Sequence, residues 1–410
     1  MARDGTPLAI TRGGKRVYPF GATLAHAVGY ASSRYGTSGL EDAFDRVLTA
    51  HASSANPLVQ AGEMIAGTHA PPRGRDIITT IDLSIQRELV RRLRMFRRAA
   101  GVVLDPRTGA VLALASVPSF DPNTLDADFA SLQKDTRSPL LDRSIAGLYP
   151  PGSTFKVVTA SEALDAGVVT PQTTFVDTGG FRIGSFTVRN DEEETTGTQT
   201  LVGAFALSSN VDFAQVALRI GVDRWLAYAA RWGLGKSLEF DLPAARDDIP
   251  ARATISPSIL AQLGFGQASL LVTPLRMALV TATVANGGVE QRPFLVRSIA
   301  GRDTSLATQP EQLAQPISAE TASEVRTMMI AVVNHGTGRA AALPDVQVAG
   351  KTGTATNPHG RSHAWFVAFA PAAAPRVVVA VVVENVGYGG TYAAPIAKSV
   401  LRVALAQERR

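Results

Sequence analysis

A serine and a lysine three residues apart open a predicted helix in the middle of the chain. Ser153 and Lys156 follow a Pro-Pro-Gly run and lead into the helix-like stretch 157–164. This context places Ser153 in the first helical turn, where free backbone N–H groups and the helix dipole favour a developing negative charge. Lys156 shares its face, and a desolvated lysine can take the proton of a serine nucleophile. The pair predicts acyl transfer; the alternative is a capping serine beside a solvated lysine.

A second polar pair interrupts an apolar helical region further along the chain. Ser208 and Asn210 lie between the segments 201–207 and 211–217. At this spacing Ser208 could relay a proton and Asn210 could hold a substrate amide. The alternative is a helix break with serine and asparagine caps, and the same S-x-N pattern recurs at 54–56.

The third candidate is a cation inside a predicted strand. Lys351, Thr352, Gly353 and Thr354 precede the apolar run 364–369. A lysine and a glycine are poor residues for a buried strand, because one brings a charge to desolvate and the other packs nothing. They therefore indicate chemistry, unless this is an edge strand protected by its lysine, with the glycine at a bulge.

The elements that must position these residues are strands at both ends of a helical region. A hairpin is predicted from 102–104 and 110–114, because proline and glycine occupy turn positions between them. Strands return at 364–369 and 377–383, and an amphipathic helix closes the chain at about 394–406. This order predicts an α+β domain whose sheet is assembled from distant parts of the chain.

Composition excludes several classes of site. The 410 residues are 45% hydrophobic, enough for a large core and two or three domains. The chain has no cysteine, which excludes disulfides, cysteine nucleophiles and thiolate metal sites. The arginine run 91–98 follows a helical apolar pattern, so a solvated helix face is favoured over a nucleic-acid or lipid patch.

No metal or organic cofactor is predicted. His335 and His363 lack the paired spacing of a metal site. The acidic run 191–194 could attract a cation, but like charges in a loop are more typical of a solvated segment.

The three motifs occur in one order, S-x-x-K at 153–156, S-x-N at 208–210 and K-T-G at 351–353. Together they resemble the signature of penicillin-binding proteins and serine β-lactamases. Segments at 149–152, 264–267, 273–278, 285–288 and 363–366 are similar to the monofunctional, class B penicillin-binding proteins. The resemblance implies a transpeptidase domain at 76–410, with a central antiparallel sheet flanked by helices.

The N-terminal segments 3–9 and 18–21 are similar to the small pedestal, or dimerisation-like, domain of that class, which we expect at 1–75. Within it a helix is predicted over 38–48, with Ser38 as N-cap and Glu41 completing a capping box. Class B proteins begin with a membrane helix that this sequence lacks, as in a truncated chain or one with a misplaced start. We expect the complete protein to be anchored at the extracytoplasmic face of the bacterial membrane, and the chain as given to be soluble.

The resemblance implies a role for each catalytic candidate. Ser153 would attack the penultimate D-alanine carbonyl of a peptidoglycan stem peptide, and a neighbouring stem's amine would resolve the acyl-enzyme. Lys156 would act as the base for acylation. Ser208 and Lys351 would help to deliver the proton to the leaving amine.

Substrate-binding roles follow from the same resemblance. Backbone N–H groups of Ser153 and Thr354 are the expected oxyanion hole. Asn210 suits a substrate amide, and the Thr352 and Thr354 hydroxyls suit the terminal carboxylate. Gly353 would leave room for the acyl group along the strand.

The same resemblance implies partners and alternatives. β-Lactams should acylate Ser153, with slow hydrolysis because no carboxylate stands out as a base; Glu162 and Glu384 are candidates, but a paired surface or core charge is favoured for each. A membrane glycosyltransferase of the shape or division type is the expected protein partner, and no nucleic acid is expected. Alternatives are a D,D-carboxypeptidase or β-lactamase on the same fold, or a non-catalytic β-lactam sensor or scaffold.

Overall fold

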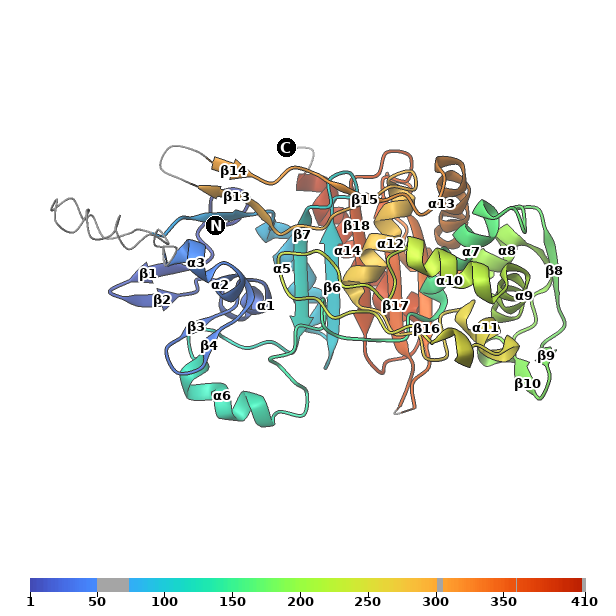
Figure 1. Cartoon of the computed structure of the whole chain (residues 1–410), viewed down its shortest axis with the longest axis horizontal. Coiled ribbons are helices and arrows are strands. Elements are labelled where there is room, and N and C mark those ends of the chain that lie inside the picture. The colour runs from blue at the N-terminus through green and yellow to red at the C-terminus, as the bar shows by residue number, and fades with distance from the viewer. Residues whose placement is uncertain (50–73, 301–304, 359, 408–410) are drawn as a thin grey trace.

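A five-stranded antiparallel sheet, in the order β16-β17-β18-β6-β7, lies at the centre of the molecule (Figure 1). The structure is a computed structural model that describes residues 1–49, 74–300, 305–358 and 360–407. The strands of the sheet are β6 (Ala99–Leu104), β7 (Val111–Val117), β16 (Ala349–Ala355), β17 (His363–Ala370) and β18 (Val377–Val383). Distant parts of the chain thus form one sheet, which confirms the predicted α+β fold.

Both faces of this sheet are covered by helices. α12 (Pro274–Ala285) packs on one face, and α5 (Leu83–Leu93) and α14 (Gly389–Gln407) pack on the other. Alternate residues of β18 enter the two cores: Val378 lies in the core that includes α12, and Val379 lies in the core that includes α5 and α14. Because helices cover both faces and exclude water, β18 is apolar at every position instead of alternating between apolar and polar residues.

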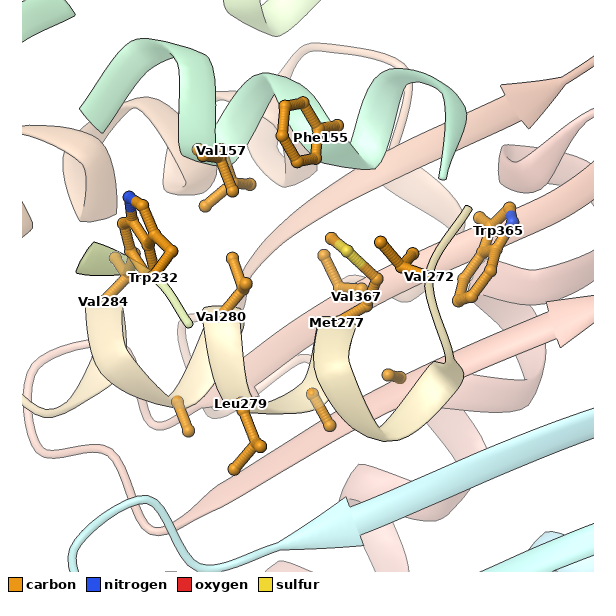
Figure 2. Close-up of a cluster of buried hydrophobic side chains, with 14 of the residues drawn as sticks. Phe155, Val157, Trp232, Val272, Met277, Leu279, Val280, Val284, Trp365 and Val367 are labelled. Atoms are coloured by element: carbon orange, nitrogen blue, oxygen red, sulfur yellow. The ribbon is translucent and has the colours of Figure 1, made fainter. Parts of the chain in front are cut away.

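The core on the α12 side holds the base of the serine-bearing segment. Phe155 and Val157 face Met277 and Val280 of α12, and Val367 of β17 lies beside them (Figure 2). Full burial of such side chains contributes about 1.5–3 kcal/mol each. The segment that carries Ser153 is therefore fixed to the sheet through shared packing.

A mainly helical region adjoins the β16 end of the sheet (Figure 1). Its helices are η2 (Gly152–Phe155), α7 (Lys156–Asp165), α8 (Leu201–Leu207), α9 (Asn210–Ile220), α10 (Val222–Arg231), α11 (Pro257–Leu263) and α13 (Ala319–Asn334). Its hairpins pair β8 (Thr174–Asp177) with β11 (Gly197–Thr200), and β9 (Phe181–Ile183) with β10 (Phe186–Val188). The turn η3 (Asp191–Glu193) follows β10.

The N-terminal part lies at the other end of the molecule (Figure 1). It contains β1 (Ile10–Arg12), β2 (Lys15–Val17), η1 (Gly21–Thr23), α1 (Ala25–Val28), β3 (Ala31–Ser32), β4 (Gly36–Thr37), α2 (Gly39–Ala43) and α3 (Asp45–Leu48). A second sheet joins β5 (Ile77–Thr79), β13 (Val296–Ala300) and β14 (Ser305–Ala307). The remaining elements are α6 (Leu125–Lys134), η4 (Arg252–Thr254), β12 (Glu290–Gln291), β15 (Gln312–Ala314) and η5 (Arg339–Ala341).

The helix predicted over 38–48 is wrong in detail. Two short helices, α2 and α3, divide at Phe44, and Ser38 makes no capping hydrogen bond through its side chain. Glu41 instead accepts a hydrogen bond from Arg16 Nε at 2.7 Å, so an ion pair replaces the predicted capping box. The expected domain boundary at 75 follows residues 50–73, which lie outside the described residues, and it stays a prediction.

None of the helices in the described ranges combines the length and the apolar character that a membrane crossing requires. The closing helix α14 begins at Gly389, earlier than predicted.

Candidate active site

Ser153 lies in a 3₁₀ turn that continues directly into α7. Its side chain is mostly buried, and the residue lines a cleft of about 370 Å³. Two bonds fix the segment before it: Trp365 Nε1 donates to Pro150 O at 3.0 Å, and the Gly152 N–H donates to Gly266 O at 2.9 Å. The predicted position of Ser153 near a helix start is confirmed.

Lys156 is fully buried one helical turn after Ser153. Its Nζ donates to Ser208 O at 2.5 Å, to Asn210 Oδ1 at 2.8 Å and to Ser208 Oγ at 3.3 Å. Burial lowers the pKa of Lys156 to about 7, although the carboxylates of Asp191 and Asp212 oppose this change. A lysine with such a pKa is a competent base near neutral pH.

Lys351 reaches the same hydroxyl from the sheet. Its Nζ donates to Ser208 Oγ at 2.7 Å and to Thr352 O at 3.2 Å. Burial, and next the positive charge of Lys156, lower the pKa of Lys351 well below its usual value. Ser208 Oγ therefore lies between two buried amines, an arrangement through which a proton can pass.

The backbone at Ser208 has an uncommon conformation. Ser208 ends α8 with φ 66°, in the left-handed region, and Ser209 begins α9 by accepting a hydrogen bond from the Asp212 N–H at 3.1 Å. Locally this is the capped helix break that the alternative interpretation described. The break also directs Ser208 and Asn210 toward Lys156, so it contributes to the geometry of the cleft.

The strand β16 forms the opposite wall. Its edge position is confirmed, but the bulge is wrong, because pairing with β17 is continuous from Ala349 to Ala355. A Cβ at Gly353 would lie 2.9 Å from both Thr154 Cγ2 and Trp365 Cβ. Close packing therefore requires this glycine, and its role in leaving room for an acyl group stays a prediction.

The cleft also contains a residue that the sequence analysis missed. Ser153, Thr352 and Thr354 line it together with Thr337, which follows α13. The Thr337 and Thr352 hydroxyls share a hydrogen bond of 2.6 Å. No pattern around Thr337 marks it in the sequence, because only the fold brings that loop to β16.

The acidic run 191–194 is exposed, as predicted for a solvated segment, but it also borders the cleft. Asp191, Glu192 and Glu194 line the same cavity as Ser153. A side-chain hydrogen bond from Tyr388 to Glu192 raises the pKa of Tyr388 to about 12. In the described part of the chain, no group of three or more histidines and carboxylates could hold a metal ion.

Of the two carboxylates considered as hydrolytic bases, Glu162 lies in the core and Glu384 is partly buried in an ion-pair network. Glu384 forms ion pairs with Arg98 at 2.8 Å and Arg143 at 2.9 Å, and it accepts a hydrogen bond from the Tyr149 hydroxyl. Glu162 is fully buried in α7, where burial raises its pKa well above the usual value. Neither residue is among those that line the cleft around Ser153.

Comparison with known families is consistent with this arrangement. The penicillin-binding protein transpeptidase domain matches residues 99–402, well over half of the chain. The chain belongs to the penicillin-binding protein transpeptidase family. Residues 2–76 match the penicillin-binding protein A dimerisation domain.

Relatives of this chain are named peptidoglycan D,D-transpeptidases. The chain is 37% identical to the peptidoglycan D,D-transpeptidase PbpA of Mycolicibacterium smegmatis, over 95% of this chain and 84% of that protein. It is 31% identical to the peptidoglycan D,D-transpeptidase MrdA of Escherichia coli, over 92% of this chain and 69% of that protein.

Solved structures give the same assignment. Penicillin-binding protein A from M. tuberculosis, in its imipenem acyl-enzyme complex, is 33% identical with a TM-score of 0.90. The alignment covers 99% of this chain and 97% of that one.

Proposed function

We propose that this protein is a serine-type peptidoglycan D,D-transpeptidase that cross-links stem peptides through an acyl-enzyme on Ser153. The observation that carries the proposal is the convergence of Lys156 and Lys351 on Ser208 Oγ beside Ser153. Two buried amines around one hydroxyl supply both a base for the nucleophile and a path for returning the proton.

In the first step Ser153 Oγ attacks the carbonyl carbon of the penultimate D-alanine, and its proton passes to neutral Lys156. The carbon–nitrogen bond then breaks, and the terminal D-alanine leaves after its amine receives a proton through Ser208 and Lys351. In the second step an acceptor amine attacks the ester, loses a proton to the same relay, and Ser153 regains its hydroxyl.

Recognition of the donor peptide is assigned to both walls of the cleft. Backbone N–H groups of Ser153 and Thr354 would stabilise the oxyanion, a contribution of about 10²- to 10³-fold in rate. Thr352 and Thr354 would bind the terminal carboxylate. Asn210 would bind the substrate amide, while its Oδ1 accepts a hydrogen bond from Lys156.

We also propose that the protein works at the extracytoplasmic face of the bacterial membrane beside a shape- or division-type glycosyltransferase. Support comes from the match of residues 2–76 to the penicillin-binding protein A dimerisation domain, and from the alignment with PbpA of Mycolicibacterium smegmatis over 95% of this chain. Co-purification with and without residues 2–76 tests this partner.

The experiment is labelling with a fluorescent penicillin, compared between the wild type and Ser153→Ala. Ser131→Ala is the matched control, because Ser131 and Lys134 repeat the S-x-x-K spacing in α6, away from the cleft. We expect loss of labelling in Ser153→Ala alone. Equal labelling of Ser153→Ala would remove Ser153 from its role.

The lifetime of the acyl-enzyme distinguishes the transpeptidase from a hydrolase on the same fold. A penicilloyl adduct that persists for many turnovers of the peptide reaction supports the transpeptidase. Rapid release of penicilloic acid would instead assign a β-lactamase or carboxypeptidase activity.

A further inference from the structure

An asparagine in the loop after β10 contacts the start of α9. Asn190 is half-buried, and its Oδ1 accepts hydrogen bonds from the Asn210 N–H at 2.7 Å and the Val211 N–H at 3.2 Å. It also accepts from Ser209 Oγ at 3.4 Å. The N–H groups of a first helical turn have no partner inside the helix, so a side chain from a remote loop caps α9.

The amide nitrogen of Asn190 fixes the loop in turn. Asn190 Nδ2 donates to Asp177 Oδ2 at 2.5 Å and to Glu194 O at 2.9 Å. The neighbouring Arg189 O accepts a hydrogen bond from Asn210 Nδ2 at 3.3 Å. Asn210 is therefore held on its backbone and on its side chain by two consecutive residues.

Asp177 is the fixed point of this network. It is almost fully buried, and it accepts hydrogen bonds from Gly179 N, Thr196 N and Thr196 Oγ1 as well as from Asn190. Burial by itself would raise the pKa of Asp177, but these hydrogen bonds outweigh burial and lower it. Asp177 remains a carboxylate at neutral pH, and the chain of contacts runs from β8 through Asn190 to Asn210.

We propose that Asn190 is a positioning residue that holds Ser208 and Asn210 in place against Lys156. The proposal deepens the proposed function and rests on it. Lys156 Nζ donates to Ser208 O and Asn210 Oδ1, so both acceptors depend on the position of this helix start. A displacement of about 1 Å in such a site can cost about 10²-fold in rate.

The charged groups that face Lys156 belong to three elements. Lys351 comes from β16, Asp191 from η3 and Asp212 from α9. Asn190 directly precedes Asp191 and contacts α9, so its loss moves both carboxylates, and their movement away would lower the pKa of Lys156. Release of the helix start also admits water beside Lys156. Because desolvation is the largest cause of the lowered pKa, its relief outweighs the carboxylates and raises the pKa of Lys156.

The experiment measures the second-order rate of acylation by a fluorescent penicillin from pH 5.5 to about 9 in Asn190→Ala and the wild type. We expect about a 10- to 100-fold loss in Asn190→Ala, and an acylation midpoint moved to higher pH. A merely structural role would not move that midpoint.

Asn123→Ala is the matched control. Asn123 also joins two segments through its amide, because its Oδ1 accepts from Tyr18 N and its Nδ2 donates to Tyr18 O, both at 2.9 Å. This contact lies in the N-terminal part, so Asn123→Ala should keep the wild-type rate and pH profile.

An exchange pair covers the case in which Asn190→Ala does not fold. Asn190→Asp alone places two carboxylates in contact. Asn190→Asp with Asp177→Asn replaces that repulsion by one donor and one acceptor, at the cost of the hydrogen bonds that Thr196 donates to Asp177 Oδ2. We expect the double variant to acylate faster than Asn190→Asp.

Three results would overturn the inference: wild-type acylation by Asn190→Ala, an unmoved pH midpoint, or no gain in the double variant. Each leaves the proposed function standing as long as the wild type is labelled at Ser153. An unlabelled wild type would remove the proposed function itself.

Discussion

The β16 wall of the cleft is held by backbone, whereas the facing loop, residues 189–194, is held by side chains, chiefly that of Asn190. β16 is hydrogen-bonded along its length to β17, and Gly152, Gly353 and Gly389 allow neighbouring backbone to approach it closely. The loop depends on Asn190, and Glu192 and Glu193 both adopt φ 56°, an uncommon conformation for residues other than glycine.

The difference separates two tasks in one site. The strand β16 carries Lys351, Thr352 and Thr354 on a backbone that close packing keeps rigid. The loop carries exposed charged side chains on strained backbone, which is typical of segments that open at low free-energy cost. Substitutions in β16 should therefore affect folding and activity together, and substitutions in the loop should affect activity alone.

Gly353→Ala gives the largest expected effect. The added Cβ would meet Thr154, Trp365 and the Pro151 carbonyl, so β16 and the serine segment must separate. We expect a loss of about 1–3 kcal/mol in the free energy of unfolding and about 10²-fold in acylation rate. Denaturant unfolding and penicillin labelling measure the two effects.

Gly203→Ala is the control for this change. In α8 the one close contact of the added Cβ is Oε1, at the end of the flexible Gln199 side chain, and alanine favours a helix by about 0.5–1 kcal/mol. If Gly353→Ala were as well tolerated as Gly203→Ala, the β16 wall would not be held by close packing.

The strand wall was largely predictable from the sequence. The apolar run 377–383 matches β18. A lysine in a strand identified a residue that packing does not explain, whereas the glycine beside it is required by close packing. Ser153 and Lys156 were placed on a helix start because the glycine and prolines before them are local signals.

The loop wall was not predictable, because its contacts are tertiary. Asn190 and Thr337 carry no periodicity, and each finds its partner in a distant segment. The acidic run 191–194 was interpreted from composition, which indicates exposure and not what the exposed residues face. The capping box predicted at Ser38 and Glu41 was wrong for a similar reason, because Arg16, distant in sequence, binds the Glu41 carboxylate.

A smaller effect is expected at Asp191, in the loop. Acylation by the wild type should rise with pH through about 7, since neutral Lys156 is the active base and its pKa lies there. The Asp191 carboxylate favours protonated Lys156, so Asp191→Asn lowers that pKa and moves the midpoint to lower pH. The pH profile of acylation measures this shift, with a rate gain of about 2- to 3-fold at pH 6.

Salt provides the control for Asp191→Asn. Asp191 lines the cleft and burial raises the pKa of its carboxyl, so about 1 M salt should weaken its field at Lys156 only in part and bring the wild-type profile partway toward that of the variant. A midpoint that moves to higher pH would show that Asp191 acts through structure and not through charge.

The smallest effect is expected at Tyr388, which contacts the loop from across the cleft. Its hydroxyl interacts with Glu192, but both side chains are exposed, and such contacts contribute little. Tyr388→Phe should leave the melting temperature unchanged and alter acylation by less than about twofold, because Asn190 still holds the loop. A loss as large as that of Asn190→Ala would mean that the loop is held from both sides of the cleft. The loop would then differ from β16 because several side chains hold it where backbone hydrogen bonds hold the strand, and Asn190 would no longer be the main one.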